Sequence, residues 1–232
     1  NQLPRLRGVD ERSRRRADGV TARPLVIAVD GPAAAGKGTL AKALAAKLGL
    51  PYLDTGLLYR AVARRMVNAG LDPAGDASAE AQALQQADLA RTDLRVPEID
   101  RGASLVAAQP AVRAALLDRQ RVFASETGAV VDGRDIGTVV FPDADVKFFI
   151  TASPRTRALR RHRQVAGETP LEGSALEAAV SELVARDARD SSRETAPLVQ
   201  AADAVLIETD GLSAAEVLDK ACEIVALRHT RR

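Results

Sequence analysis

A glycine-rich loop between an apolar run and a helix-forming segment is the feature that most constrains this chain. Residues 25–29 form a continuous apolar run, which is typical of a buried parallel strand. A helical pattern covers residues 36–48 and ends at Gly49. Between them lies a G-x-x-x-x-G-K loop with the sequence Gly31-Pro32-Ala33-Ala34-Ala35-Gly36-Lys37-Gly38-Thr39. Strand, loop and helix in this order predict an α/β fold that binds nucleotide phosphates.

The chemistry of the loop follows from its residue types. Gly31 and Gly36 permit turns that a Cβ atom would obstruct. The loop N–H groups and the N-terminus of the next helix form a nest for anions, and Lys37 reaches the β and γ phosphates. Because Gly38 stands where Ser or Thr is usual, Thr39 is the expected hydroxyl ligand of Mg²⁺. We therefore expect ATP and Mg²⁺ as cofactors, bound by residues 31–39, although the loop alone does not specify the reaction.

Further apolar runs extend the same pattern along the chain. Residues 51–53, 129–131, 146–150 and 204–208 predict four more strands. Helical patterns cover residues 57–69, most of 71–94, 103–125 and the segment after 211. This alternation predicts a P-loop fold of three layers, αβα, around a central parallel five-stranded sheet.

Composition and charge exclude several classes of protein. No run approaches the ~18 apolar residues of a membrane span, so no membrane partner is expected. The single cysteine, Cys222, cannot form an intrachain disulfide and favours a cytoplasmic location. Residues 1–24 contain seven Arg and three acidic residues, which leaves a net charge of about −2 on the rest of the chain. A slightly acidic body argues against nucleic-acid binding.

Several arginines indicate a second phosphate ligand. Arg60 falls near a predicted helix start beside Thr55, and Arg134 follows a predicted strand end. A guanidinium group can donate two parallel hydrogen bonds to a phosphate. The i, i+4, i+7 spacing of Arg186, Asp190 and Arg193 predicts one helix face, although alternating charges are also typical of a solvated face.

Three ordered motifs resemble the bacterial cytidylate kinases, a branch of the P-loop nucleoside monophosphate kinases. They are the G-K-G-T ending followed by Asp54-Thr55-Gly56-x-x-Tyr59-Arg60, the run from Asp132 to Pro142, and the run from Arg186 to Leu198. The resemblance covers about residues 25–227. It implies transfer of a phosphoryl group from ATP to CMP and dCMP, giving CDP and dCDP in pyrimidine nucleotide metabolism, by a phosphotransferase whose acceptor is a phosphate.

The resemblance also implies roles for the site residues. It assigns Ser104, Arg113 and Asp135 to cytosine, whose N4 amino group can donate a hydrogen bond to a carboxylate. It assigns Asp190 with Arg186 to the ribose, and Arg60, Arg134 and Arg193, beside Thr55, to the acceptor phosphate. Asp132 resembles a Walker-B acid near Mg²⁺. The implied catalytic residues are Lys37, Asp132, Arg134, Arg160 and Arg161, with Arg157 beside ATP.

Arg157, Arg160 and Arg161 look like the arginines of a kinase lid, although a solubilising helix face has the same pattern. The resemblance divides the chain into a core of about 25–56, 126–155 and 196–227, an acceptor-binding insertion of about 57–125 and a lid of about 156–195. Residues 1–24 and 228–232 are expected to be tails, the first disordered. Residues 88–104 show little strand character, as in a short acceptor insertion. We expect a monomer whose partners are CMP or dCMP and ATP.

Three alternatives remain beside this interpretation. A UMP/CMP or adenylate kinase shares the fold, but the Gly133-Arg134-Asp135 run argues against it. A nucleotide-dependent switch or regulatory ATPase would not require a second set of arginines. A non-catalytic binding protein would not need an intact Lys37 and Thr39.

Overall fold

The computed structural model of the chain describes residues 23–229. The expected disordered tail therefore lies outside the described residues except for Arg23 and Pro24. Arg23 donates hydrogen bonds to the Asp143 carbonyl oxygen at 2.8 Å and to the Asp145 carboxylate at 2.7 Å. At the other end, α9 (Ala214–His229) continues past residue 227, so the tail predicted from residue 228 was placed too early.

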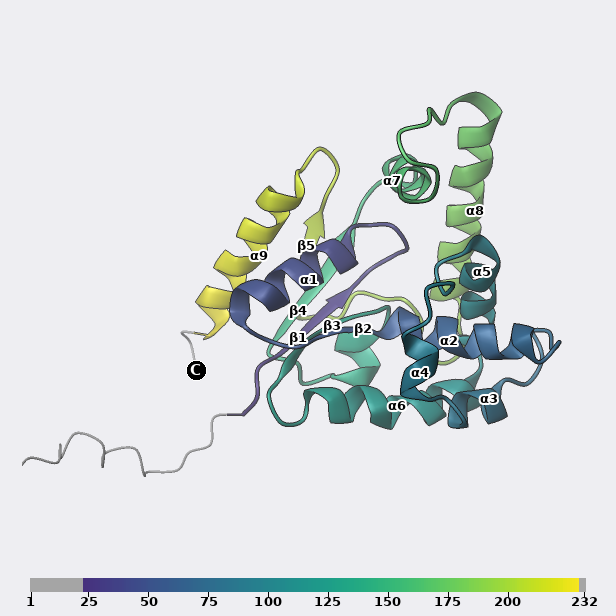
Figure 1. The fold of residues 1–232 in the computed structure, drawn as a ribbon. Coiled ribbons are helices and arrows are strands. Elements are labelled where there is room, and N and C mark those ends of the chain that lie inside the picture. Colours follow the sequence, from purple (N-terminus) through teal and green to yellow (C-terminus); the bar gives the residue numbers. More distant parts are fainter. Residues whose placement is uncertain (1–22, 230–232) are drawn as a thin grey trace, which may run out of the picture.

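A parallel five-stranded sheet forms the centre of the molecule, as predicted (Figure 1). Its strands lie in the order β2-β3-β1-β4-β5, with bounds Tyr52–Asp54, Ala129–Asp132, Val26–Asp30, Val146–Thr151 and Val205–Glu208. Asp54 pairs in register with Asp132, and Asp30 ends the neighbouring strand. Three carboxylates therefore meet at the carboxyl edge of the sheet, where open α/β sheets bind their ligands.

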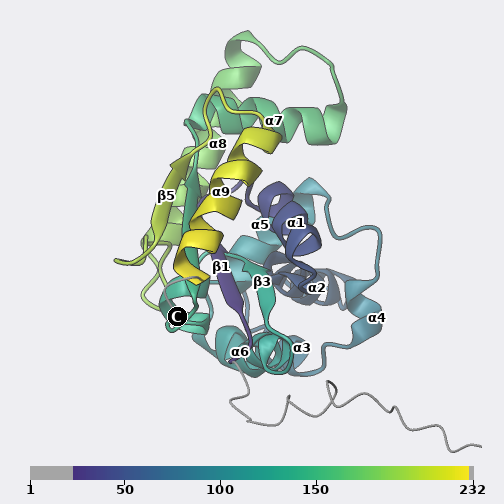
Figure 2. The ribbon, with the colours of Figure 1, turned by 90° about the vertical axis from the view of Figure 1, so that its left-hand side faces the viewer.

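Helices cover both faces of the sheet. Figures 1 and 2 show α1 (Lys37–Leu48) and α9 on one face, where they bury residues such as Ile27, Leu44 and Phe148. The other face packs Val131 against the π-helical turn η2 (Ile136–Val140). Among residues 23–229, no helix has both the length and the apolar character that crossing a bilayer requires.

Five helices between β2 and β3 pack around an apolar core of their own. They are α2 (Thr55–Asn68), α3 (Ser78–Gln82), α4 (Gln86–Leu89), α5 (Pro97–Val106) and α6 (Pro110–Ala124). Leu58, Met66, Ile99 and Leu116 belong to this core. The single helix predicted over 103–125 was wrong, because Pro110 starts a new helix and disfavours helical geometry in the residue before it.

Two helices form an α7–α8 hairpin beyond the carboxyl edge of the sheet (Figure 1). They are α7 (Pro154–Ala166) and α8 (Gly173–Ser191), which pack against each other. The prediction that Arg193 shares a helix face with Arg186 and Asp190 was wrong, because α8 ends at Ser191. The Ser192 hydroxyl donates to the Arg189 carbonyl oxygen at 3.5 Å, a local bond of the kind that competes with helix continuation.

Candidate active site

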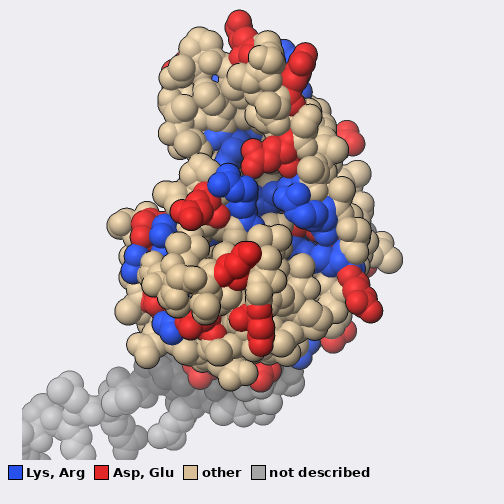
Figure 3. All heavy atoms as spheres, turned by 90° about the vertical axis from the view of Figure 1, so that its right-hand side faces the viewer, with Lys and Arg blue, Asp and Glu red and all other residues tan. Residues whose placement is uncertain are grey.

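A cavity of about 610 Å³ opens between the glycine-rich loop, the five-helix insertion and the hairpin. In Figure 3, Lys and Arg side chains gather in a band where the upper lobe meets the rest of the molecule. Most of the predicted site residues line this cavity, namely Ala33, Ala34, Gly36, Lys37, Gly38, Thr39, Thr55, Arg60, Ser104, Arg113, Asp132, Arg134, Asp135, Arg161, Arg186, Asp190 and Arg193. Five others, Gly31, Pro32, Ala35, Arg157 and Arg160, are absent from its lining.

The loop has the geometry of an anion cradle. Gly31 has φ +142°, and a Cβ atom there would collide with the Ile150 carbonyl oxygen. Gly36 is the N-cap of α1 in the left-handed conformation. The Lys37 ammonium donates to the Pro32 carbonyl oxygen at 2.9 Å, and burial, followed by the charge of Arg134, lowers the pKa of Lys37. An arriving phosphate would supply the counter-charge that this buried cation needs.

Asp132 lies across the loop from Lys37 and ends β3. Burial raises the pKa of its carboxyl group, and the Tyr52 hydroxyl donates to its Oδ2 at 3.3 Å. A Cβ atom on Gly38 would lie 3.2 Å from the same oxygen, which explains why a glycine suits that position. The described residues contain no cluster of three or more metal-ligating side chains. Mg²⁺ typically takes one or two protein ligands plus phosphates and water. The hydroxyl of exposed Thr39 and the carboxylate of buried Asp132 fit that demand.

A buried ion pair marks the opposite end of the cavity. Arg113, on α6, donates a short hydrogen bond to Asp135 Oδ2, and both side chains are almost fully buried. The Arg113 guanidinium also lies 5.5 Å from the centroid of the Tyr59 ring. Ser104 lines the same cavity, and its hydroxyl donates to Asp190 at 3.4 Å. The Arg113–Asp135 pair presents one donor group and one acceptor group side by side.

Positive charge surrounds Asp190, which lies one residue before the end of α8. Its carboxylate accepts from Arg134 Nε at 3.2 Å and forms a short ion pair with Arg193. Burial alone would raise the pKa of Asp190, but the neighbouring arginines outweigh it and lower the pKa. Burial, followed by the charge of Arg134, lowers the pKa of Arg186 to about 10, and Arg186 Nε has no hydrogen-bond partner. Arg186 Nε is therefore a buried donor that lacks an acceptor among the described residues.

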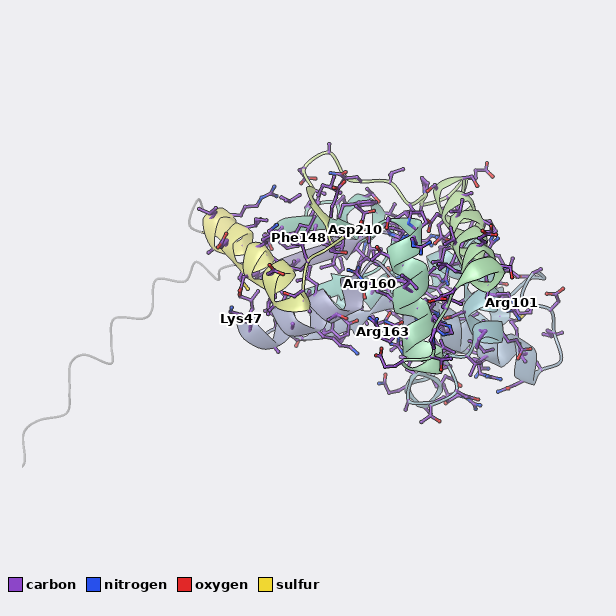
Figure 4. The ribbon with its side chains drawn as sticks, turned by 90° about the horizontal axis from the view of Figure 1, so that it is seen from above. Lys47, Arg101, Phe148, Arg160, Arg163 and Asp210 are labelled. Atoms are coloured by element: carbon purple, nitrogen blue, oxygen red, sulfur yellow. The ribbon has the colours of Figure 1, made fainter. Side chains whose placement is uncertain are left out.

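Arg157 and Arg160 lie behind the loop. Arg157 donates to the Ala33 carbonyl oxygen at 3.2 Å and pairs with both oxygens of Asp187. Arg160 donates to the Thr209 carbonyl oxygen at 2.8 Å and weakly to that of Ala35 at 3.4 Å. Figure 4 shows Arg160 on α7, with Asp210 labelled beyond β5. In this structure the two arginines brace the outer side of the loop, whereas Arg161 faces the cavity.

Two buried carboxylates were missed by sequence reasoning. Asp30 accepts hydrogen bonds from the N–H groups of Ile136 and Gly137 at 2.8 and 2.7 Å, which links the start of the glycine-rich loop to the turn after Asp135. Its sequence signal was an acid at the end of an apolar strand. Asp100 accepts from Arg60 at 2.7 Å and from Arg161. No comparable signal marked Asp100 in the sequence, because it lies on a helix that carries other charged residues.

Comparisons with known proteins agree with this geometry. The model of the cytidylate kinase family matches residues 27–227. The chain is similar to a cytidylate kinase of Acidiphilium cryptum, with 57% identity over 88% of this chain and 96% of that protein. A cytidylate kinase of Granulibacter bethesdensis is 55% identical over 89% and 99% of the two chains. A crystal structure of an uncharacterized protein from Eubacterium ventriosum shares the fold, with a TM-score of 0.51, 14% identity and coverage of 87% and 98%.

Proposed function

Because the chain belongs to the cytidylate kinase family, we propose that it transfers the γ-phosphoryl group of ATP to CMP and dCMP, giving ADP with CDP or dCDP. One observation carries the proposal. The glycine-rich loop, a second cluster of cations and the buried Arg113–Asp135 pair all line the same cavity of about 610 Å³. The cavity therefore places a loop suited to the phosphates of one nucleotide beside cations and a polar pair suited to a second.

The transfer needs positioning and charge neutralisation more than a protein nucleophile. A phosphate oxygen of the acceptor attacks the γ phosphorus, and the bond from that phosphorus to the β–γ bridging oxygen breaks. Lys37 and the loop N–H groups hold the β and γ phosphates. Arg134 and Arg161 lie in the cavity lining, where they oppose the negative charge of the transferring group. Thr39 and Asp132 would hold Mg²⁺, which when bound neutralises the ATP phosphates.

The acceptor phosphate is proposed to bind Arg60, Arg134 and Arg193, with the Thr55 hydroxyl nearby. At present that hydroxyl donates to the Asp132 carbonyl oxygen at 2.8 Å. Asp190 and Arg186 are proposed to bind the sugar, and Ser104 lies within hydrogen-bond distance of Asp190. The Asp190 carboxylate can accept a hydrogen bond, and Arg186 Nε has a hydrogen bond left to donate. A sugar hydroxyl both donates and accepts, so it suits this pair.

Cytosine recognition is assigned to Asp135 and Arg113. A carboxylate accepts from the N4 amino group, and a guanidinium donates to the O2 and N3 atoms. Uracil carries a carbonyl oxygen in place of the amino group, so the same carboxylate would face a second acceptor. A desolvated pair rejects such a mismatch, because its own polar atoms would lose their partners.

We also propose that helices α2–α6 are the acceptor-binding insertion and that the α7–α8 hairpin is the lid. Gly167 and Gly173 flank the connection between α7 and α8 with φ of +70° and +57°. Closure of the hairpin would exclude water from the transferring phosphoryl group. We propose that the chain acts as a monomer, because no step proposed for the reaction requires a residue from a second chain. The single free cysteine fits a cytoplasmic enzyme.

A panel of acceptors tests the proposed function. The rate of ADP release is measured with CMP, dCMP, UMP and AMP at equal concentrations. We expect CMP and dCMP to be phosphorylated and UMP and AMP to be much poorer acceptors, by about 10² or more. A UMP rate equal to the CMP rate would contradict the assignment of the base-binding pair. ATP hydrolysis without any acceptor dependence would favour a regulatory ATPase instead.

A further inference from the structure

Asp100 is a buried carboxylate shared by arginines from two different parts of the molecule. Its Oδ1 accepts from Arg60 Nε at 2.7 Å, and its Oδ2 accepts from Arg161 Nη2 in a short ion pair. Arg60 belongs to α2 of the insertion, whereas Arg161 belongs to α7 of the hairpin. Asp100 itself lies on α5 and is only 5% exposed. One side chain therefore joins the hairpin to the insertion at the edge of the active site.

Packing contributes little to the same junction. A second cavity of about 220 Å³ lies between α5 and the hairpin, with Asp100, Arg161 and Leu183 in its lining. In the described part of the chain, the apolar cluster that α7 and α8 share contains no residue of α5. Polar contacts therefore hold the hairpin against α5, namely the ionic bridge through Asp100 and the hydrogen bond from Ser104 to Asp190 at 3.4 Å.

The two arginines would repel each other without this carboxylate. Burial, followed by the positive charge of Arg60, lowers the pKa of Arg161, which shows that the cations disfavour each other. A single carboxylate between them offsets most of that repulsion at short range. Arg60 also lies 3.9 Å from Asp54, which pairs with Arg95. Three arginines and two carboxylates therefore leave one positive charge uncompensated in the lining of the cavity in which phosphates are expected.

We propose that Asp100 is a positioning residue that holds Arg161 of the hairpin beside Arg60 until nucleotide phosphates supply the counter-charge. This inference rests on the proposed function, because it assumes that both arginines face phosphates during the reaction. It predicts a dependence on ligands that a merely structural ion pair would not show. Loss of the Asp100 charge should loosen the hairpin in the empty protein and have little effect once phosphates are bound.

Hydrogen exchange in the Asp100→Asn variant tests this dependence. The substitution keeps the side-chain shape and removes its charge. Without nucleotides, we expect backbone amides of residues 161–176 to exchange about tenfold faster than in the wild type. With CMP and a non-hydrolysable ATP analogue bound, the two proteins should exchange alike. Inorganic phosphate at high concentration should restore part of the protection, since it supplies charge without a base or sugar.

Two further variants serve as controls. Asp93→Asn removes a carboxylate that pairs with Arg91 and Arg64 in the same insertion but is absent from the lining of either cavity, and it should leave the hairpin unchanged. Asp100→Glu keeps the charge and should restore most of the protection.

Two results would overturn the role of Asp100. In the first, Asp100→Asn leaves the exchange of the empty protein unchanged. In the second, the faster exchange persists unchanged with both nucleotides bound, which would indicate loosened packing rather than a missing counter-charge. Turnover of CMP by the wild type is measured separately. If the wild type does not phosphorylate CMP, the proposed function fails. The role of Asp100 is still tested in that case, because the measurement with inorganic phosphate needs no nucleotide.

Discussion

At the scale of single residues, the site depends on titratable groups that are buried before any ligand arrives. Lys37, Arg113 and Asp135 are each less than 10% exposed, and Arg186 Nε has no partner. Burying a charge is costly unless a counter-charge lies close by. We therefore expect nucleotide binding to supply the partner that Arg186 Nε lacks, whereas Arg113 and Asp135 already neutralise each other.

The base-binding pair gives the first prediction. In Asp135→Ala, we expect the ratio of kcat/KM for CMP to that for UMP to fall by about tenfold or more, because the acceptor for the N4 amino group is lost. The KM for ATP should change far less. Initial rates with each acceptor measure both quantities, and Asp143→Ala is the surface control. An unchanged CMP preference and an unchanged KM for CMP would refute the assignment.

The lowered pKa of Lys37 predicts that protons are taken up when ATP binds. Its pKa is lowered in the empty site, and bound phosphate should raise it again by adding negative charge. Binding of Mg²⁺-free ATP at pH 8 should therefore take up protons, since the ATP phosphates are already ionised at that pH. Calorimetry in buffers of different ionisation enthalpy measures this uptake.

Lys37→Ala is the matched variant for that measurement. It should show reduced proton uptake and a kcat lower by about 10² or more, as expected for a lost charge at the transferring group. Equal uptake in both proteins would assign the protons to another group, and near-normal turnover would contradict the phosphate role of Lys37.

At the scale of elements, the glycine-rich loop crosses very close to a strand. Gly31 has φ +142°, and a Cβ atom there would collide with the backbone of β4 at Ile150. Gly31→Ala should therefore lower the free energy of unfolding by about 3 kcal/mol or more. Gly49→Ala is the control, because Gly49 also has a positive φ, +65°, but no atom lies within 4 Å of its Cβ position.

Urea denaturation of the two glycine variants separates steric conflict from backbone strain alone. The Gly49 variant should lose only about 1–2 kcal/mol, the cost of placing an L-residue in the left-handed region. Equal losses in the two variants would show that the close approach to Ile150 has no special role.

Local patterns predicted the strands well and the helical insertion less well. The five strands are short apolar runs, and the three central ones, β3, β1 and β4, are largely buried, which leaves a clear signal. The break before Pro110 and the end of α8 at Ser191 depend on local hydrogen bonds and on proline geometry, which a helical period does not record. The brace formed by Arg157 and Arg160 depends on contacts with residues far along the chain, such as Ala33 and Thr209.

At the scale of the whole molecule, the sheet, insertion and hairpin bring three sets of charges to one cavity. The motifs predicted which residues meet there, because the carboxyl ends of parallel strands share an edge. The motifs did not predict Asp30 and Asp100, whose carboxylates accept hydrogen bonds around the site. Asp30 and Asp100 each bind groups more than 35 residues away, so no spacing in the sequence reveals their partners.

The fate of the transferred phosphoryl group tests the account most directly. ATP labelled at the γ phosphorus is incubated with Mg²⁺, CMP and the enzyme, and the labelled products are separated. We expect the label to move to the β position of CDP, and its appearance there to require CMP. Release of the label as inorganic phosphate at the same rate with and without CMP would contradict it.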